Sequence, residues 1–231
     1  MKLLEKERFN IILNILNEKN YVTYEELEKI IGLSSSTVRR DVNKMEKMQL
    51  LTKISGGIEI FKENKDVDYN LRQNKNVQKK KKIAKIASKF LNKDEMIFLD
   101  AGSSTYELIP YLKNMNITVV TNSTNHLEKL IENNVNTIII GGKVKFKTRS
   151  IVGSQALLQL KNFNFDACFM GANGVCRENG FSTPDIEEAT LKKTVIEKSK
   201  KKYILADSTK FNKVFNVTFA RFEDCVLITE N

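Results

Sequence analysis

The sequence predicts an α/β protein in two parts, a small helical head followed by a larger domain around a mostly parallel sheet. The chain has 231 residues, 41% of them hydrophobic, which is enough for two domains with buried cores. Apolar residues recur at helical spacing through the first 60 positions, whereas strand-like runs alternate with helical segments beyond residue 90. We therefore assign a head to 1–60, a linker to 61–76 and the α/β domain to 77–231.

Composition and motif content exclude several classes of protein. The longest apolar runs, such as 137–140, fall far short of the roughly 18 residues that cross a bilayer. The first residues return to charge after Leu3-Leu4 and lack the apolar core of a signal peptide, so we expect a cytoplasmic protein without membrane contact.

Cysteine and histidine content argues against metal and disulfide chemistry. The three cysteines, Cys168, Cys176 and Cys225, are odd in number and widely spaced, which predicts neither a zinc site nor a disulfide framework. Cys168 and Cys225 lie in apolar runs and are expected to be small core residues. The single histidine, His126, has no nucleophile motif around it, and we expect it on the solvated surface.

The net charge of +10 is concentrated in the middle of the chain. Residues 61–90 hold ten basic and three acidic side chains, including the run Lys79-Lys80-Lys81-Lys82. Such a density attracts a polyanion at low salt. A solvated face of a basic helix explains it equally well, so the charge supports nucleic-acid binding without establishing it.

The head begins with two predicted helices. Apolar residues fall on one helical face across 4–16. Thr23 and Glu26 then form a capping-box pattern that starts a short second helix, which ends at Gly32.

A third helix is predicted to begin directly after Gly32. Ser34 is a preferred N-cap residue, and Leu33 and Val38 occupy the positions of a hydrophobic staple. Val38, Val42 and Met45 form its inward seam, so a face of hydroxyls, arginines and an asparagine points outward. Arginine suits guanine edges, asparagine suits adenine, and Ser, Thr and Lys hold phosphates, so this face suits the major groove of DNA.

Two short strands, 50–53 and 58–60, are joined by a glycine-containing tip and form a predicted wing. The alternative is a small helical domain with a solvated polar face, but three short helices plus this hairpin form a specific combination. The predicted DNA-contacting residues lie on the third helix and the wing: Ser34, Ser35, Ser36, Thr37, Arg39, Arg40, Asn43, Lys44, Lys47, Lys53, Ser55 and Gly56.

The larger domain is predicted to contain a basic amphipathic helix over 77–91 and six strands. The strands are expected at 96–99, 117–120, 137–140, 167–170, 203–206 and 225–228. Helices are expected between them at about 105–113, 124–133, 154–161 and 185–200. This alternation indicates a mostly parallel sheet, and open sheets of this kind bind ligands beyond the carboxyl ends of their strands.

Small, hydroxylic and amide residues follow five of these strands, where a phosphate would fit best at the turn 102–105, which starts a helix. Lysines could supply counter-charge, while Asp100, Asn122, Asp185 and Glu188 could bind sugar hydroxyls. Each turn taken singly is also explained by ordinary turn chemistry. The candidate effector-binding residues are Asp100, Gly102, Ser103, Ser104, Thr105, Thr121, Asn122, Gly141, Gly142, Lys143, Gly171, Ala172, Asn173, Gly174, Glu188, Lys192, Asp207 and Lys210.

The sequence lacks the motifs of nucleotide-binding and catalytic sites. The chain has no GxxxxGK[ST] motif, and the turn 171–174 lacks the third glycine of a dinucleotide fingerprint. No nucleophile and base pair is visible, so we expect no catalytic residue, no metal ligand and no cofactor.

The motifs resemble the DeoR family of bacterial transcription regulators along nearly the whole chain. The segment 33–42 resembles that family's helix-turn-helix signature, and 50–51 with 55–57 resembles its wing, although Ser55 stands where a histidine is frequent. Six segments of the larger domain match in order: 100–105, 120–123, 141–142, 169–174, 188–192 and 206–211.

The resemblance implies binding of double-stranded operator DNA by the head and of a phosphorylated sugar by the larger domain, usually in a repressor of a sugar or nucleoside operon. A homo-oligomer, dimer or tetramer, is expected because paired heads suit paired half-sites. The related sugar-phosphate isomerases carry Asp-Gly-Ala-Asp where this chain has Met170-Gly171-Ala172-Asn173, which implies binding without turnover. The alternatives are an isomerase fused to a DNA-binding head and a redox or nicotinamide sensor, and the missing carboxylates and glycine fingerprint argue against them.

Overall fold

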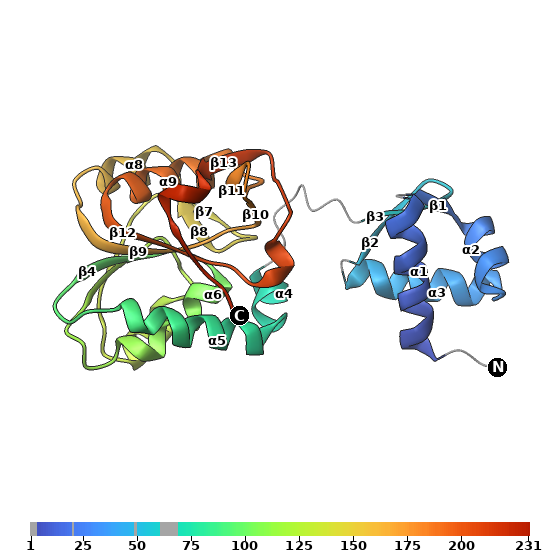
Figure 1. Ribbon diagram of the computed structural model, residues 1–231, viewed down its shortest axis with the longest axis horizontal. Helices are drawn as coiled ribbons and strands as arrows, with labels where there is room; N and C mark the ends of the chain where they lie inside the picture. Colours follow the sequence, from blue (N-terminus) through green and yellow to red (C-terminus); the bar gives the residue numbers. More distant parts are fainter. Residues whose placement is uncertain (1–3, 20, 49, 61–68) are drawn as a thin grey trace. The chain divides into compact units, whose positions relative to one another are not determined.

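The computed structural model describes residues 4–19, 21–48, 50–60 and 69–231. The chain divides into two compact units, Met1–Glu63 and Asn64–Asn231, each with its own core (Figure 1). No helix within the described ranges is long and apolar enough to cross a bilayer.

The first unit packs three helices against a small antiparallel sheet with the strand order β1-β3-β2. Its elements are α1 (Glu5–Lys19), β1 (Tyr21–Thr23), α2 (Tyr24–Ile31), α3 (Ser35–Lys47), β2 (Leu51–Ile54) and β3 (Gly57–Ile60). Val38, Val42 and Met45 of α3 are fully buried, as the helical phase predicts. The three predicted helices and the wing hairpin are present, and β1 is an addition that the sequence analysis did not anticipate.

The helix ends follow the predicted capping with one difference. The Glu26 amide donates to Thr23 Oγ1 at 3.1 Å, the Thr23 amide donates to Glu26 Oε2 at 3.0 Å, and Gly32 ends α2 with a φ of 69°. Ser34 occupies the N-cap position of α3, but its hydroxyl makes no capping bond and lies 3.0 Å from Thr37 Oγ1.

The second unit is built on a parallel sheet of six strands in the order β14-β12-β9-β4-β5-β6. These strands are β4 (Met96–Leu99), β5 (Thr118–Thr121), β6 (Asn136–Ile139), β9 (Phe165–Gly171), β12 (Ser199–Leu205) and β14 (Val226–Ile228). They are the six predicted strands, with bounds that differ by a few residues. The parallel strands, joined through helices, therefore confirm the α/β class.

Helices cover both faces of this sheet (Figure 1). One layer packs on the core around Ile97 and Phe169 and contains α5 (Val77–Ala87), η1 (Ser88–Phe90), α6 (Ser103–Tyr106), η2 (Ile109–Leu112) and α7 (Leu127–Glu132). The other packs around Phe98 and Met170 and contains α8 (Ser154–Leu160) and α9 (Ile186–Glu197). The predicted helix at about 105–113 is thus divided into α6 and η2, with Pro110 in the first turn of η2.

Short strands that the sequence analysis did not predict surround the carboxyl ends of the sheet. A hairpin pairs β7 (Lys143–Lys145) with β8 (Ser150–Val152), and a second sheet has the order β10 (Gly174–Cys176), β11 (Gly180–Thr183), β13 (Val217–Ala220). The short 3-10 turns η3 (Ser208–Lys210) and η4 (Phe222–Asp224) complete the unit. Strands of three or four residues are too short for alternation to be recognised in a sequence.

Two expectations are corrected by the structure. The predicted linker 61–76 contains a helix, α4 (Tyr69–Asn74), which packs against α6, while 61–68 lies outside the described residues. His126 is fully buried and not on the surface, because it precedes α7 where its ring packs beside Tyr106 and reaches the Gly102 carbonyl. A lone histidine beside polar residues carries no sequence signal for burial.

Candidate functional site

The outward face of α3 is the candidate DNA-binding surface. Ser35, Ser36, Arg39, Arg40, Asn43, Lys44 and Lys47 are exposed, and Thr37 is half-buried. Within the described part of the chain, Arg40 and Lys47 make no hydrogen bond or ion pair, so both side chains are available to a partner. Predicted DNA contacts at Ser34, Lys53, Ser55 and Gly56 also lie at exposed positions.

Several of these side chains are already positioned by neighbours. The Arg39 guanidinium lies 4.6 Å from the centre of the Tyr24 ring. Lys53 Nζ of the wing donates to Asn43 Oδ1 at 2.9 Å, and Lys44 pairs with Glu5 at 2.6 Å. The candidate surface therefore combines fixed groups with free cations.

A buried ion pair, which the sequence analysis did not predict, holds α3 against α1. Arg8 donates to both carboxylate oxygens of Asp41, with Nε to Oδ2 at 2.6 Å and Nη2 to Oδ1 at 3.0 Å. Asp41 is 1% exposed, and this carboxylate raises the pKa of Arg8 through its hydrogen bond. The pair fixes the angle at which α3 presents its outer face.

In the second unit, three of the predicted effector residues meet at the ends of β4 and β9. Lys192 Nζ donates to Asp100 Oδ2 at 2.5 Å and to the Gly171 carbonyl at 3.0 Å. The Gly171 amide donates back to Asp100 Oδ2 at 2.9 Å. Both side chains of the pair are 6% exposed, so the lysine charge is already balanced inside the protein.

The turn after β4 lies beside this ion pair. A Cβ added to Gly102 would lie 3.8 Å from Asp100 Oδ2, so the turn passes close to the carboxylate. Thr105 Oγ1 donates to the carbonyls of Asp100 and Gly102, and Asn122 Oδ1 accepts from the Ala101 amide at 3.0 Å. Ser103 is buried at the same turn, and α6 has only four residues, so backbone amides and hydroxyls matter more here than a helix dipole.

A second group of candidate residues surrounds the start of α9. Glu188 accepts from Ser150 Oγ at 3.0 Å and lies 3.4 Å from Lys145 Nζ, which also pairs with Asp185 at 2.8 Å. Asp185 caps α9, and hydrogen bonds to Lys145 and the Glu188 amide lower its pKa against the opposing effect of burial. Lys145 and Ser150 were missed because they lie on the short strands β7 and β8.

Lys143 departs from the expected arrangement. Its side chain is 67% exposed and pairs with Glu187 at 3.1 Å. The neighbouring Gly141 is held by Gln159, whose Oε1 accepts from its amide at 3.0 Å. Gly142 adopts a φ of 151°, and a Cβ there would lie 2.7 Å from the Val152 carbonyl.

The remaining candidates lie after β9 and β12. Asn173 Oδ1 accepts from Thr183 Oγ1 at 3.2 Å, Ala172 is half-buried, and Gly174 lies under Phe215. Asp207 caps η3 through the Thr209 amide at 2.9 Å, and the Lys210 amide donates to the Asp207 carbonyl at 3.0 Å. The candidates thus form three polar groups at the carboxyl ends of the strands: one around Asp100, one around Glu188, and one in the turns after β9 and β12.

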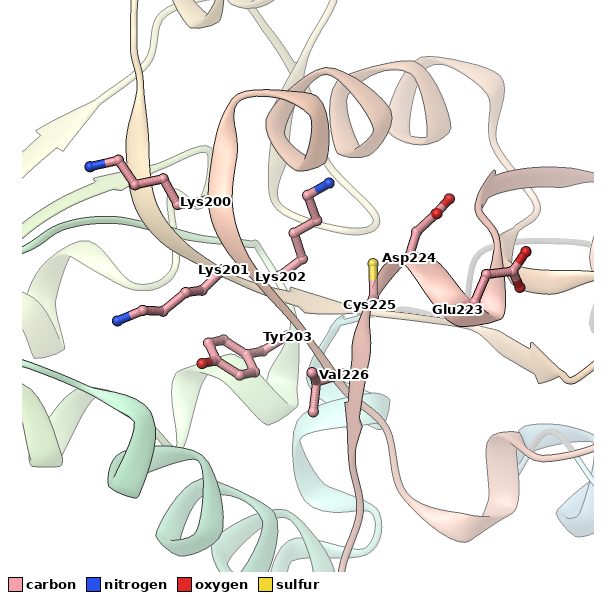
Figure 2. Close-up of a pocket in the computed structure, with 8 residues that line it drawn as sticks. All are labelled: Lys200, Lys201, Lys202, Tyr203, Glu223, Asp224, Cys225 and Val226. Atoms are coloured by element: carbon pink, nitrogen blue, oxygen red, sulfur yellow. The ribbon is translucent and has the colours of Figure 1, made fainter.

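An open pocket of about 350 Å³ lies elsewhere (Figure 2). It is lined by the first half of β12, Lys200–Tyr203, and by the segment Glu223–Val226. None of the predicted effector residues lines it, and it lies toward the amino ends of the strands. We therefore do not assign it to the effector.

The fold defines a class of DNA-binding protein. It combines a three-helix head and a wing with an α/β domain whose polar strand ends are typical of ligand-binding sites. The DeoR-like helix-turn-helix domain matches residues 8–64, and the DeoR C terminal sensor domain matches residues 75–231. The chain belongs to the DeoR family and is a transcriptional regulator.

Relatives from Bacillus subtilis (strain 168) match along most of their length. The uncharacterized HTH-type transcriptional regulator FruR is 35% identical over 229 residues, which is 98% of this chain and 91% of that protein. The HTH-type transcriptional regulator IolR is 33% identical over 90% of this chain and 85% of its own. Among solved structures, eIF2B delta from Chaetomium thermophilum is similar in fold, with a TM-score of 0.52 and 14% identity over 70% of this chain and 59% of that one.

Proposed function

We propose that this regulator represses a sugar or nucleoside catabolic operon. A phosphorylated sugar, bound at the carboxyl ends of the parallel strands, would control its affinity for operator DNA. The observation that carries the proposal is the gathering of Asp100, Lys192, Asn122 and the turn 102–105 at the ends of three adjacent strands, β9, β4 and β5. Buried carboxylate and amide groups suit sugar hydroxyls, and a glycine and hydroxyl turn suits a phosphate.

Binding without turnover is the form of action we propose for this site. Isomerisation of a sugar phosphate needs a base that can accept a proton from carbon. Asp100 is held by Lys192 at 2.5 Å, and position 173, where the isomerase pattern has a carboxylate, holds an asparagine engaged by Thr183. We accordingly propose no enzyme activity and no cofactor beyond the effector itself.

The regulator is proposed to act as a homo-oligomer in the cytoplasm, where it would reach chromosomal DNA. A single head of this size has a small contact surface, and two heads on half-sites about 34 Å apart would share the binding free energy. Effector and operator would then affect each other's affinity by the same factor, typically 1 to 3 kcal/mol.

Thermal unfolding of the full chain against paired phosphorylated and free sugars tests the proposal. A ligand at 100 times its Kd stabilises by about 2.7 kcal/mol, or several degrees for a domain of this size. We expect one phosphorylated sugar to raise the Tm while its free form does not, and the same sugar phosphate to change the affinity for operator DNA. A sugar phosphate that is consumed in a coupled isomerase assay, or a panel without any rise, would contradict the proposal.

A further inference from the structure

The effector site described above leaves the negative charge of a phosphate without an assigned cation. Lys192 is already balanced by Asp100, and Lys143 is exposed and paired with Glu187. An anion bound beside the turn 102–105 would be stabilised by a cation whose own hydrogen bonds are not already used.

Arg72 of α4 is such a cation. Its Nε and Nη2 atoms are buried, yet they have no hydrogen-bond partner among the described residues. The guanidinium lies 5.8 Å from the centre of the Tyr69 ring on the same helix. Leaving buried guanidinium donors unsatisfied is costly, and such groups usually mark a bound anion or water.

The position of α4 is set by three fixed contacts. The Tyr69 amide donates to the Lys147 carbonyl at 2.9 Å, which joins α4 to the hairpin of β7 and β8. Lys80 of α5 is buried, and its Nζ donates to the carbonyls of Arg72 and Lys75. Burial lowers the pKa of Lys80 to about 8. The backbone of α4 is therefore held at a defined place, and the half-buried Arg72 side chain starts from it.

That place adjoins the effector site. Helix α4 packs against α6, which contains three of the four residues of the turn 102–105. On the loop before α7, His126 Nε2 lies 3.2 Å from the Gly102 carbonyl, and the His126 ring is 5.6 Å from the Tyr106 ring. His126 Nδ1 and Ser123 Oγ are fully buried and, like the Arg72 donors, have no partner in the described part of the chain. Unsatisfied polar atoms thus gather on α4 and on the loop after β5, around one short helix.

We propose that Arg72 binds the anionic group of the effector, so that the ligand is held between the strand ends and α4. This inference depends on the effector function proposed above and adds the residue that recognises the anion. It also adds a route of control, because α4 directly follows the segment that joins the two units. An effector that bonds to Arg72 would stabilise α4, which is the first described element of the second unit.

Inorganic phosphate is the probe for the first test, with the full chain and calorimetric titration as the readout. We expect Arg72→Gln to weaken phosphate binding about ten- to hundredfold, the loss typical of a charge-assisted contact. Arg72→Lys keeps the charge and loses the fork, and we expect an intermediate loss. Arg177→Gln is the matched control, since Arg177 is an exposed arginine of the same unit on the turn between β10 and β11.

Hydrogen exchange of the α4 amides is the second readout, and a purely structural role of Arg72 would not move it. Phosphate should slow exchange over 69–74 in the wild type and in Arg177→Gln, and should leave it unchanged in Arg72→Gln. Equal phosphate affinity in the wild type and both Arg72 variants would overturn the proposal while leaving the effector function intact. Failure of phosphate and of every sugar phosphate to bind the wild type would overturn both.

Discussion

Replacing Lys192 by methionine should destabilise the second unit strongly. Lys192 Nζ supplies two hydrogen bonds, to Asp100 Oδ2 at 2.5 Å and to the Gly171 carbonyl at 3.0 Å. Without the lysine, the bond from the Gly171 amide is the one that the described residues still provide to the buried Asp100 carboxylate. Removing one partner of a buried pair costs about 3 to 5 kcal/mol, because an uncompensated charge stays buried.

Adding Asp100→Asn to Lys192→Met should recover part of this loss, since the double variant has no buried charge. Hydrogen exchange of amides in β4 and β9 measures opening of this unit by itself, independent of the head. We expect the stability losses of Lys192→Met and Asp100→Asn, added together, to exceed the loss of the double variant by about 1 to 3 kcal/mol. A loss below about 1 kcal/mol for Lys192→Met, or strict additivity of the two changes, would refute the assignment of the pair as a buried, mutually dependent ion pair.

Three further predictions concern the head and the buried histidine. Arg40→Ala should weaken specific operator binding by about 1 to 3 kcal/mol. Lys47→Ala should reduce the slope of log affinity against log salt concentration by about 1. Both are measured by fluorescence anisotropy, and unchanged binding in both variants would refute the assignment of α3 as the DNA-binding helix. Burial lowers the pKa of His126 to about 4, so the unfolded chain binds more protons than the folded one between pH 6.5 and 4. The free energy of unfolding should therefore fall by roughly 3 kcal/mol as the pH drops through that window. His126→Phe should make the unfolding free energy, measured by urea denaturation at each pH, depend less on pH in this window. An identical pH dependence in the variant would contradict the prediction. Thr23→Ala should destabilise the head by about 1 kcal/mol through loss of the α2 cap, and a Tm of the head equal to wild type would exclude that role.

The sequence predicted elements whose signals are local. The capping box at Thr23 and the buried seam of Val42 depend on neighbours within four positions, and the six parallel strands are continuous apolar runs. The location of the effector candidates followed from topology, because carboxyl ends of parallel strands meet at one edge.

Features that depend on contacts distant in sequence could not be predicted. Asp41 and Arg8 are 33 positions apart, and Asp100 and Lys192 are 92 apart, so neither pairing is visible in the order of residues. Lys192 was one of the lysines that could supply counter-charge, and the structure pairs it with Asp100. The helix α4 is short and begins among charged residues, so its pattern is indistinguishable from that of a linker.

The wing, the second helix and the third helix of the head are braced by direct contacts. The Tyr24 amide donates to the Gly56 carbonyl at the wing tip, and the Tyr24 ring lies under Arg39. Strand β1 joins the same sheet as the wing through β3. A head braced in this way leaves more of the adjustment to the DNA, so base pairs that the protein never touches would influence affinity through the stiffness and groove width of the operator.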